Sequence, residues 1–362
     1  FFVMSCVNGF CGAVGNTPLI KIESISKATG CDVYGKAEFL NPGGSIKDRA
    51  ALFMIEGACK KGDLEKGGLV IEATAGNTGV GLAHVCRAKG FRCIFVCPNH
   101  VSDEKVQQLL LLGAEDVVRV ERLPATDPGN YQNLAKRMAK EQNGVCLDQY
   151  NNLDNMKAHI ETTGPEIWNQ TDGKIDALIL ASGTGGTIAG CSTYLKSKNP
   201  NVSVYLADVI GSGVTVKTKE DNQSKIEELN LKFNDTLREK FPEEKIDKST
   251  VMEGIGSSVL YGNLGNAIVD GILDVSDESG IQMCHYMLNY EGIFIGGSAG
   301  INLCGAYLLA KKLGPGHKIV TFLCDGGARY ASKIYNKTWL EENNFDVSAN
   351  ALEDFQFLSK QE

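Results

Sequence analysis

The segment Asn41–Arg49 places a lysine where a turn gives way to a helix. Its turn residues Asn-Pro-Gly-Gly lead to Ser45, a fair helix N-cap, and we expect a helix to begin beside Lys47 and to cover 49–61. The N-terminus of a helix carries partial positive charge, so it favours a neutral amine over an ammonium. Such an amine can form a Schiff base with an aldehyde cofactor. Taken alone, the motif fits equally well a surface Lys-Asp-Arg run on an ordinary first turn.

A second motif, Glu72-Ala73-Thr74-Ala75-Gly76-Asn77-Thr78-Gly79, follows an expected strand and opens an expected helix. Backbone N–H groups and the hydroxyls of Thr74 and Thr78 should therefore converge at a helix N-terminus, which is an arrangement that binds carboxylates. Asn77 is well sized to donate a hydrogen bond to a neighbouring ring oxygen. A purely structural loop is the alternative.

A third motif, Ser182-Gly183-Thr184-Gly185-Gly186-Thr187, also lies between an expected strand and helix. It lacks the Walker lysine and the full dinucleotide fingerprint, so nucleotide binding is weakly supported. A short cup of glycine and threonine at a helix N-terminus suits a single phosphate monoester. Dinucleotide binding stays open, because Asp208 could bind a ribose at the end of the next strand.

The fourth motif, Gly296-Gly297-Ser298-Ala299-Gly300-Ile301-Asn302, follows the apolar run 292–295. Its first five residues match the G-x-S-x-G elbow, which would make Ser298 a hydrolase nucleophile. Such a hydrolase needs a later acid and then a histidine, and the only later histidine is His317. This alternative leaves the other three motifs without a role.

Short apolar runs alternate with helical stretches through most of the chain, which indicates an α/β fold with right-handed crossovers around largely parallel sheets. The expected strands are 32–39, 68–73, 92–97, 117–120, 177–181, 203–208 and 318–323. The expected helices are 49–61, 79–89, 102–112, 131–143, one after Gly186 and one from Arg329.

The composition is that of a globular protein, with 43% hydrophobic and 22% charged residues among 362. A net charge of −8 argues against a general nucleic-acid binder. The twelve cysteines form no CxxC pair, and Cys93, Cys97 and His100 do not match a usual zinc spacing. We therefore expect no metal site, and we expect buried, reduced cysteines in a reducing compartment.

Three segments stand apart from the motifs. Residues 1–14 carry no charge, and we prefer a first apolar element over the trimmed end of an anchor or presequence. Residues 217–248 are highly charged with apolar residues in helical rhythm, which predicts a surface insertion. The tail from Glu341 onward is polar and is expected to be peripheral.

Together the four motifs resemble the cysteine synthase and cystathionine β-synthase branch of the fold-type II pyridoxal-phosphate (PLP) enzymes. The likeness runs in order from about Gly12 to about Asn336. Further matching segments are Gly15–Leu19, Leu147–Tyr150, Glu161–Glu166 and Cys324–Tyr330. The resemblance implies a tryptophan synthase β-like fold with two open, twisted, mostly parallel sheets flanked by helices. It also implies a large PLP domain of residues 1–41 and 152–345, a small mobile substrate-gripping domain of 42–151, and a peripheral tail of 346–362.

The resemblance also assigns roles to single residues. Lys47 would bind the cofactor covalently and later move the α-proton, Asn77 would contact the ring hydroxyl, and Ser298 would face the pyridine nitrogen. The phosphate cup would be Gly183, Thr184, Gly185, Gly186 and Thr187. The substrate would contact Thr74, Ala75, Gly76, Thr78, Gln149 and Gly254. Many members carry serine where this chain has Ala75. We expect this departure to affect the affinity for the substrate carboxylate more than the type of reaction.

The implied reaction replaces the acetate of O-acetylserine with sulfide to give L-cysteine. Cystathionine β-synthase and β-cyanoalanine synthase activities remain open, as does a non-catalytic relative that senses a metabolite or binds a protein. The resemblance implies small-molecule substrates and a homodimer, and it admits a complex with serine acetyltransferase that no residue marks. A reducing compartment means the cytoplasm or the mitochondrion.

Overall fold

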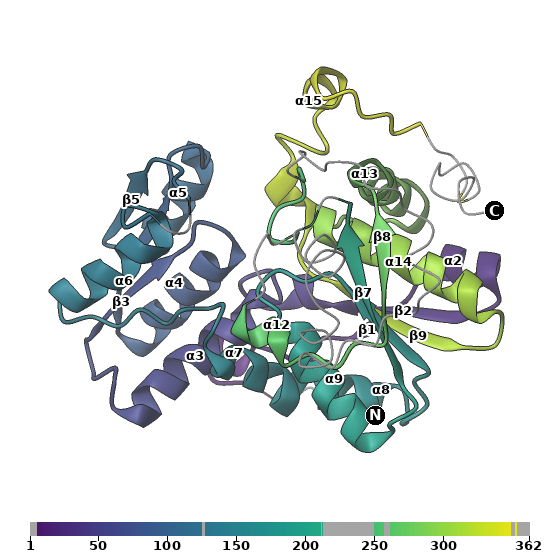
Figure 1. The fold of residues 1–362 in the computed structure, drawn as a ribbon, viewed down its shortest axis with the longest axis horizontal. Helices are drawn as coiled ribbons and strands as arrows, with labels where there is room; N and C mark the ends of the chain where they lie inside the picture. The colour runs from purple at the N-terminus through teal and green to yellow at the C-terminus, as the bar shows by residue number, and fades with distance from the viewer. Residues whose placement is uncertain are drawn as a thin grey trace. The chain divides into compact units, whose positions relative to one another are not determined.

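The computed structural model describes residues 6–124, 127–210, 212, 250–256, 261–348 and 352. The chain divides into two compact units (Figure 1). Unit 1 comprises Phe1–Asn16 and Asn41–Ala158, and unit 2 comprises Thr17–Leu40 and His159–Glu362. The charged segment 217–248 and the first five residues lie outside the described residues.

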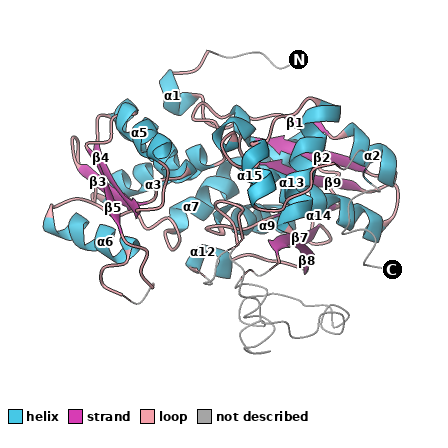
Figure 2. Ribbon diagram, turned by 90° about the horizontal axis from the view of Figure 1, so that it is seen from above, coloured by secondary structure: helices cyan, strands magenta, loops and turns pink. Residues whose placement is uncertain are grey.

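Unit 1 is built on a parallel three-stranded sheet with helices on both faces (Figure 2). Because side chains alternate along a strand, Val70 and Phe95 face the core that α3 and α4 cover, whereas Ile71 and Val96 face α6. The strands are β3 (Leu69–Ala73), β4 (Arg92–Pro98) and β5 (Asp116–Val120). The helices are α1 (Gly9–Gly12), α3 (Lys47–Lys61), α4 (Asn77–Lys89), α5 (Asp103–Leu111), α6 (Tyr131–Glu141) and α7 (Leu153–Ala158).

Unit 2 contains a six-stranded sheet in the order β1-β2-β9-β6-β7-β8, in which only β1 is antiparallel to its neighbour. Its strands are β1 (Leu19–Lys21), β2 (Asp32–Ala37), β6 (Ala177–Leu180), β7 (Ser203–Val209), β8 (Gly271–Val275) and β9 (Lys318–Leu323). Its α-helices are α2 (Glu23–Thr29), α8 (Gly164–Gln170), α9 (Gly186–Lys198), α12 (Gly262–Gly265), α13 (Asp277–Tyr286), α14 (Gly297–Leu313) and α15 (Lys337–Glu342). The first fourteen residues of α14 are all buried, so this helix forms the centre of the core of unit 2.

The predicted α/β class with mostly parallel sheets flanked by helices is confirmed. Helices α3 and α4 begin two residues earlier than the sequence indicated, at Lys47 and Asn77. The apolar run 292–295 contributes only an isolated bridge between Ile295 and Gly326, not a strand. Strands β1 and β8 and helices α2, α8 and α13 were not predicted.

The helix expected from Arg329 is a short 3₁₀ turn, Gly327–Tyr330, and α15 follows it later. The reason for the later start is local, because the side chain of Asn336 accepts the N–H of Trp339 and so caps α15. After α15, Phe345 and Val347 pack against the core and Leu352 is buried in it. These described residues of the segment expected to be peripheral therefore take part in the packing of unit 2.

Two of the matching segments prove to be structural supports. Lys36 on β2 is fully buried, and its ammonium donates to Glu166 Oε2 at 2.6 Å and to Gln170 Oε1 at 3.0 Å. Thr17 donates to Glu38 Oε1 at 2.6 Å, and its carbonyl accepts from both Lys36 and Gln170. A buried charge needs such partners, because burial without them is costly.

All twelve cysteines lie among the described residues and all are free thiols. Seven are buried, which agrees with the prediction that they act as small hydrophobic side chains, but Cys6 and Cys59 are exposed. Among the described residues we find no group of side chains arranged to hold a metal ion. Within the same part of the chain, no helix has the length and apolar character needed to cross a bilayer.

Candidate functional site

Lys47 is the first residue of α3 and is half-buried. The turn before it is tied to the helix by Asp48, whose carboxylate accepts the N–H of Gly43 at 2.6 Å. Ser45 does not occupy the cap position that we expected, because Ile46 immediately precedes the helix. The Ser45 hydroxyl instead accepts the N–H of Lys47 at 3.2 Å.

The loop 74–78 joins β3 to α4 in the same unit, with Asn77 as the first residue of the helix. The hydroxyl of Thr74 accepts the N–H of Gly76 at 3.3 Å. Gly76 is exposed, and a Cβ added there would meet no atom within 4 Å, so the backbone of this loop has open space in front of it. Ala75 packs into the apolar core beneath the loop.

Unit 1 brings Lys47 close to this loop. Gly81 lies one turn after Asn77 on α4, and a Cβ built on it would fall 3.1 Å from the carbonyl oxygen of Lys47. The beginnings of α3 and α4 therefore pack side by side, and the lack of a side chain at Gly81 permits the approach.

Gln149 also belongs to this group of residues, because its side chain contacts Thr78. Its side-chain oxygen accepts the hydroxyl of Thr78 at 2.7 Å, and its amide nitrogen donates to the carbonyl of Ala73 at 3.4 Å. Asn155 donates to its backbone carbonyl at 2.9 Å. Thr74, Thr78 and Gln149, which were expected to act together, are therefore gathered by unit 1.

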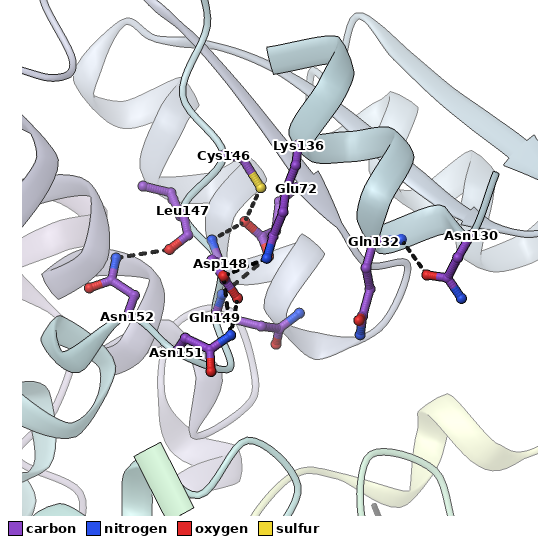
Figure 3. A network of polar contacts seen from close by, with 10 residues as sticks. All are labelled: Glu72, Asn130, Gln132, Lys136, Cys146, Leu147, Asp148, Gln149, Asn151 and Asn152. Carbon is purple, nitrogen blue, oxygen red and sulfur yellow. Dashed lines mark hydrogen bonds and ion pairs between the residues drawn. The ribbon is translucent and has the colours of Figure 1, made fainter. Parts of the chain in front are cut away.

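Glu72 is a residue of this region to which the sequence pattern assigned no role. Its side chain is 2% exposed, and its carboxylate accepts the backbone N–H groups of Asp148 at 3.0 Å and Gln149 at 3.3 Å (Figure 3). Burial raises the pKa of the Glu72 carboxyl to about 7. The sequence did contain a signal for Glu72, because a carboxylate inside an apolar strand next to a glycine-rich loop is unusual enough to indicate a role.

In unit 2 the loop 182–187 joins β6 to α9, and Gly185 has a left-handed backbone with φ of 88°. A Cβ on Gly183 would fall 2.0 Å from the carbonyl oxygen of Gly254, and one on Gly185 would fall 2.4 Å from the N of Leu264. Gly254 therefore lies against the loop, and two of its glycines have no room for a side chain. The buried hydroxyl of Ser182 has no hydrogen-bond partner in the described part of the chain.

His159 is a second residue that sequence reasoning missed. It opens a π-helical turn, His159–Thr163, and lies between two threonines. Its Nε2 is 3.2 Å from the hydroxyl of Thr187, and its Nδ1 is 2.8 Å from that of Thr163. The imidazole thus holds the orientation of a hydroxyl in the loop 182–187.

Ser298 is the second residue of α14 and is 8% exposed. One turn later, the buried side chain of Asn302 accepts the N–H of Ala181 at 2.6 Å and donates to the carbonyl of Phe322 at 2.8 Å. Asn302 therefore joins the start of α14 to the residues that end β6 and β9. The hydrogen bonds of Asn302 therefore help to position both the loop 182–187, which follows Ala181, and Ser298, one turn earlier in α14.

Replacing Asn302 with alanine should lower the free energy of unfolding by about 2–4 kcal/mol, because it leaves a buried N–H and a buried C=O without their partner. Urea denaturation followed by circular dichroism measures this change. Asn343→Ala is the matched control, because the Asn343 amide donates to the Trp339 carbonyl at an exposed position. Equal stabilities of the two variants would contradict the assigned role of Asn302.

The hydrolase alternative for Ser298 lacks a histidine in the right place. His317 immediately precedes β9, and its Nδ1 is 3.0 Å from the carbonyl oxygen of Gly314. Ser298 follows Ile295, which pairs with Gly326 beyond the other end of β9. The six residues of β9 separate the two ends by roughly 20 Å, far outside hydrogen-bond reach.

A comparison with protein-family models matches residues 11–325 to the model described as pyridoxal-phosphate dependent enzyme. The chain belongs to this family. Membership of the pyridoxal-phosphate dependent family explains the glycine and threonine loop at the start of α9 as a site for one phosphate group, which favours this interpretation over dinucleotide binding. Asp208, the residue offered for a ribose, is buried, and its carboxylate accepts the N–H of Val209 at 3.0 Å.

Several relatives within the pyridoxal-phosphate dependent family are cysteine synthases. Cysteine synthase 1 of Neurospora crassa is 44% identical over 93% of this chain and 85% of its own length. The cysteine synthase of Dictyostelium discoideum is 42% identical over 94% of this chain and 87% of its own length. A cystathionine β-synthase of Apis mellifera is 36% identical over 92% of this chain, which covers 62% of that protein. A solved hydrogen sulfide-producing enzyme of Fusobacterium nucleatum superposes with a TM-score of 0.74 at 30% identity, covering 90% of this chain and all of that one.

The donor groups of this member fit pyridoxal phosphate. The loop 182–187 offers backbone N–H groups at the start of a long helix, the hydroxyls of Thr184 and Thr187, and the buried hydroxyl of Ser182 without a partner in the described residues. Its glycines let Gly254 and Leu264 pack directly against the loop, where a Cβ would collide with them, and so fix the course of its backbone. In unit 1, the amine of Lys47 and the amide of Asn77 stand at the starts of α3 and α4 and are of the kinds that such a cofactor uses.

Proposed function

We propose that this enzyme makes L-cysteine by replacing the acetate of O-acetyl-L-serine with sulfide. The observation that carries the proposal is near full-length similarity to cysteine synthases at 42–44% identity. The contacts that gather Thr74, Thr78 and Gln149 at the start of α4 support it, because they form a grip for an amino-acid carboxylate.

Four groups are proposed to hold the cofactor. Lys47 would hold it covalently through its side-chain amine, and Asn77 would donate to the ring hydroxyl. The phosphate is bound by Gly183, Thr184, Gly185, Gly186 and Thr187 at the start of α9. Ser298 would face the pyridine nitrogen with a neutral hydroxyl, and the bound ring would then be a weaker electron sink than one paired with a carboxylate, which would favour loss of the β-substituent over transamination.

When bound, pyridoxal phosphate supplies the electron sink that lets the α-proton and the β-substituent of the amino acid depart. The side chains perform the other steps. The substrate carboxylate is held by the N–H groups and hydroxyls of residues 74–78 and by the Gln149 amide, with Gly254 as a further contact. Lys47 removes the α-proton as general base and returns it when the product leaves.

Ala75 weakens this grip by one hydroxyl relative to a serine at the same place. Such a hydrogen bond contributes about 0.5–1.5 kcal/mol, and the backbone N–H of residue 75 remains as a donor. Because Ala75 packs into the apolar core beneath the loop, we attribute to it a supporting role for the backbone.

The proposed reaction is tested by offering two substrate pairs to the purified, cofactor-loaded protein. O-acetyl-L-serine with sulfide should give a higher kcat/KM than serine with homocysteine. The reverse order would favour a cystathionine β-synthase, a possibility supported by the 36% identity to the Apis mellifera protein. A visible spectrum that no amino acid perturbs, together with no turnover of either pair, would leave only a binding role.

We also propose a domain closure, an oligomeric state and a cellular compartment for this protein. The unit that contains residues 42–151 closes over the bound amino acid to exclude water. The protein is a homodimer in a reducing compartment, cytoplasmic or mitochondrial, where exposed thiols such as Cys6 and Cys59 stay reduced. Size-exclusion chromatography with light scattering tests the dimer, and the same measurement with added serine acetyltransferase tests that partner.

A further inference from the structure

The side chain of Glu72, on β3, binds the backbone of the segment that follows Val145. Val145 pairs with β3 through backbone bonds to Leu69 and Ile71, at 2.8 and 2.9 Å. Beyond that point the two oxygens of Glu72 accept the backbone N–H groups of Asp148 and Gln149. The side chain thus fixes the backbone on which Gln149 is mounted (Figure 3).

The other contacts of Gln149 depend on that backbone position. Its side-chain oxygen accepts from Thr78 at 2.7 Å, and its amide nitrogen reaches the carbonyl of Ala73, the residue that follows Glu72. The backbone of Glu72 therefore leads into the loop 74–78, and its side chain binds the segment that carries Gln149. If the Glu72 carboxylate accepts these hydrogen bonds less strongly, the position of the Gln149 side-chain amide against residues 74–78 must change.

We propose that Glu72 is a positioning residue that sets the Gln149 amide against residues 74–78 for the amino-acid carboxylate, and that only its ionised form does so fully. This inference rests on the proposed function, in which those residues bind that carboxylate. An ionised carboxylate accepts both N–H bonds, and such charge-assisted bonds are stronger than neutral ones. A protonated carboxyl commits one oxygen to an O–H group and accepts less well there.

The charges around Glu72 place its titration in the physiological range. Burial is the largest of the causes that raise its pKa to about 7; the nearby carboxylate of Asp148 also acts to raise the pKa, and the N–H bonds act to lower it. Lys136 of α6 pairs with Asp148 at 2.7 Å, the Cys146 thiol is 3.9 Å from Glu72 Oε2, and the register partner on β4 is the apolar Phe95.

The raised pKa of Glu72 determines how the free energy of unfolding and the substrate affinity change with pH. Because the folded pKa lies above the ordinary value of 4.5, the Glu72 contribution to the free energy of unfolding is fully present below pH 4.5 and is lost as the pH rises through about 7. Substrate affinity should change in the opposite sense and improve as the pH rises through the same range, because the ionised form is the one that positions Gln149.

The test uses Glu72→Gln in the cofactor-loaded full chain, with L-alanine as an amino-acid probe that has no β-leaving group. At pH 8 the variant should bind L-alanine about tenfold more weakly by calorimetry, from the loss of a buried charged acceptor. It should also show a similar rise in the KM for O-acetyl-L-serine with kcat within about twofold. At pH 6 the two proteins should converge, because the wild-type carboxyl is then largely protonated.

Two further variants keep the test decisive. Glu115→Gln is the matched control, because Glu115 pairs with Arg92 on the exposed edge of the same unit and should leave binding unchanged. Asp148→Asn suits the left-handed backbone at that position (φ 51°) and removes a charge that raises the Glu72 pKa, so the pH midpoint of L-alanine binding should move down. This variant tests the inference even if Glu72→Gln fails to fold.

Failure of the inference and failure of the proposed function give different results. If the wild-type protein binds L-alanine and Glu72→Gln binds it equally well at every pH, or if Asp148→Asn leaves the midpoint in place, Glu72 is not the positioning residue. If the wild-type protein binds neither L-alanine nor O-acetyl-L-serine, the proposed function itself is wrong.

Discussion

Replacing Lys47 with alanine should lower turnover of O-acetyl-L-serine by at least about 10³-fold, since it removes the group that we propose as both covalent anchor and general base. The fold should survive the change. Lys47 is half-buried in the first turn of α3, where an ammonium is electrostatically disfavoured, and no packing of the core depends on it. Steady-state kinetics at saturating pyridoxal phosphate and a urea denaturation curve measure the two effects.

Lys60 provides the control, because it is an exposed lysine near the other end of the same helix. Lys60→Ala should keep wild-type turnover. Lys36, the fully buried lysine, is committed to Glu166 and Gln170 and cannot replace the missing amine. A Lys47→Ala protein that retains more than a few per cent of wild-type kcat would show that another group moves the α-proton.

Replacing Gly183 with alanine should weaken binding of pyridoxal phosphate by about tenfold to hundredfold, because overpacking of this size costs about 1–3 kcal/mol. The new Cβ would lie 2.0 Å from the carbonyl oxygen of Gly254, and neither atom belongs to a flexible side chain. Relief therefore requires the backbone of the loop 182–187 to move, which displaces the N–H groups proposed to hold the phosphate. Titration of cofactor-free protein with pyridoxal phosphate, followed by its visible absorption, gives the dissociation constant.

Gly326→Ala is the matched substitution in the same unit, since the nearest atom that its Cβ would meet among the described residues is the carbonyl oxygen of Phe294 at 4.0 Å, an ordinary contact distance. It should change the cofactor dissociation constant by less than about twofold. Equal affinities of the Gly183→Ala and wild-type proteins would mean that this loop does not bind the phosphate.

The strand–loop–helix junctions of the candidate site could be predicted from the sequence because their signals are local. Glycines and threonines that follow an apolar run and precede a helical stretch mark the loops 74–78 and 182–187 without reference to the rest of the chain. The apolar run 292–295 before the fourth motif is a connection with a single bridge rather than a strand.

The residues that support the site could not be predicted because their partners lie far away in the sequence. Glu72 and Gln149 are 77 residues apart, His159 and Thr187 are 28 apart, and Asn302 and Ala181 are 121 apart. Each of these side chains looks like an ordinary polar residue in its own segment. Their partners come close only in the folded chain, as where the bridge between Val70 and Val145 lays the segment before Gln149 alongside β3.

The central claim is that the amine at position 47 carries the cofactor. Borohydride reduction of the loaded, active enzyme followed by proteolysis and mass spectrometry tests it most directly. We expect the phosphopyridoxyl mass on the peptide that contains Lys47 and on no other lysine peptide. Active, cofactor-loaded protein in which that peptide is unmodified would contradict the assignment.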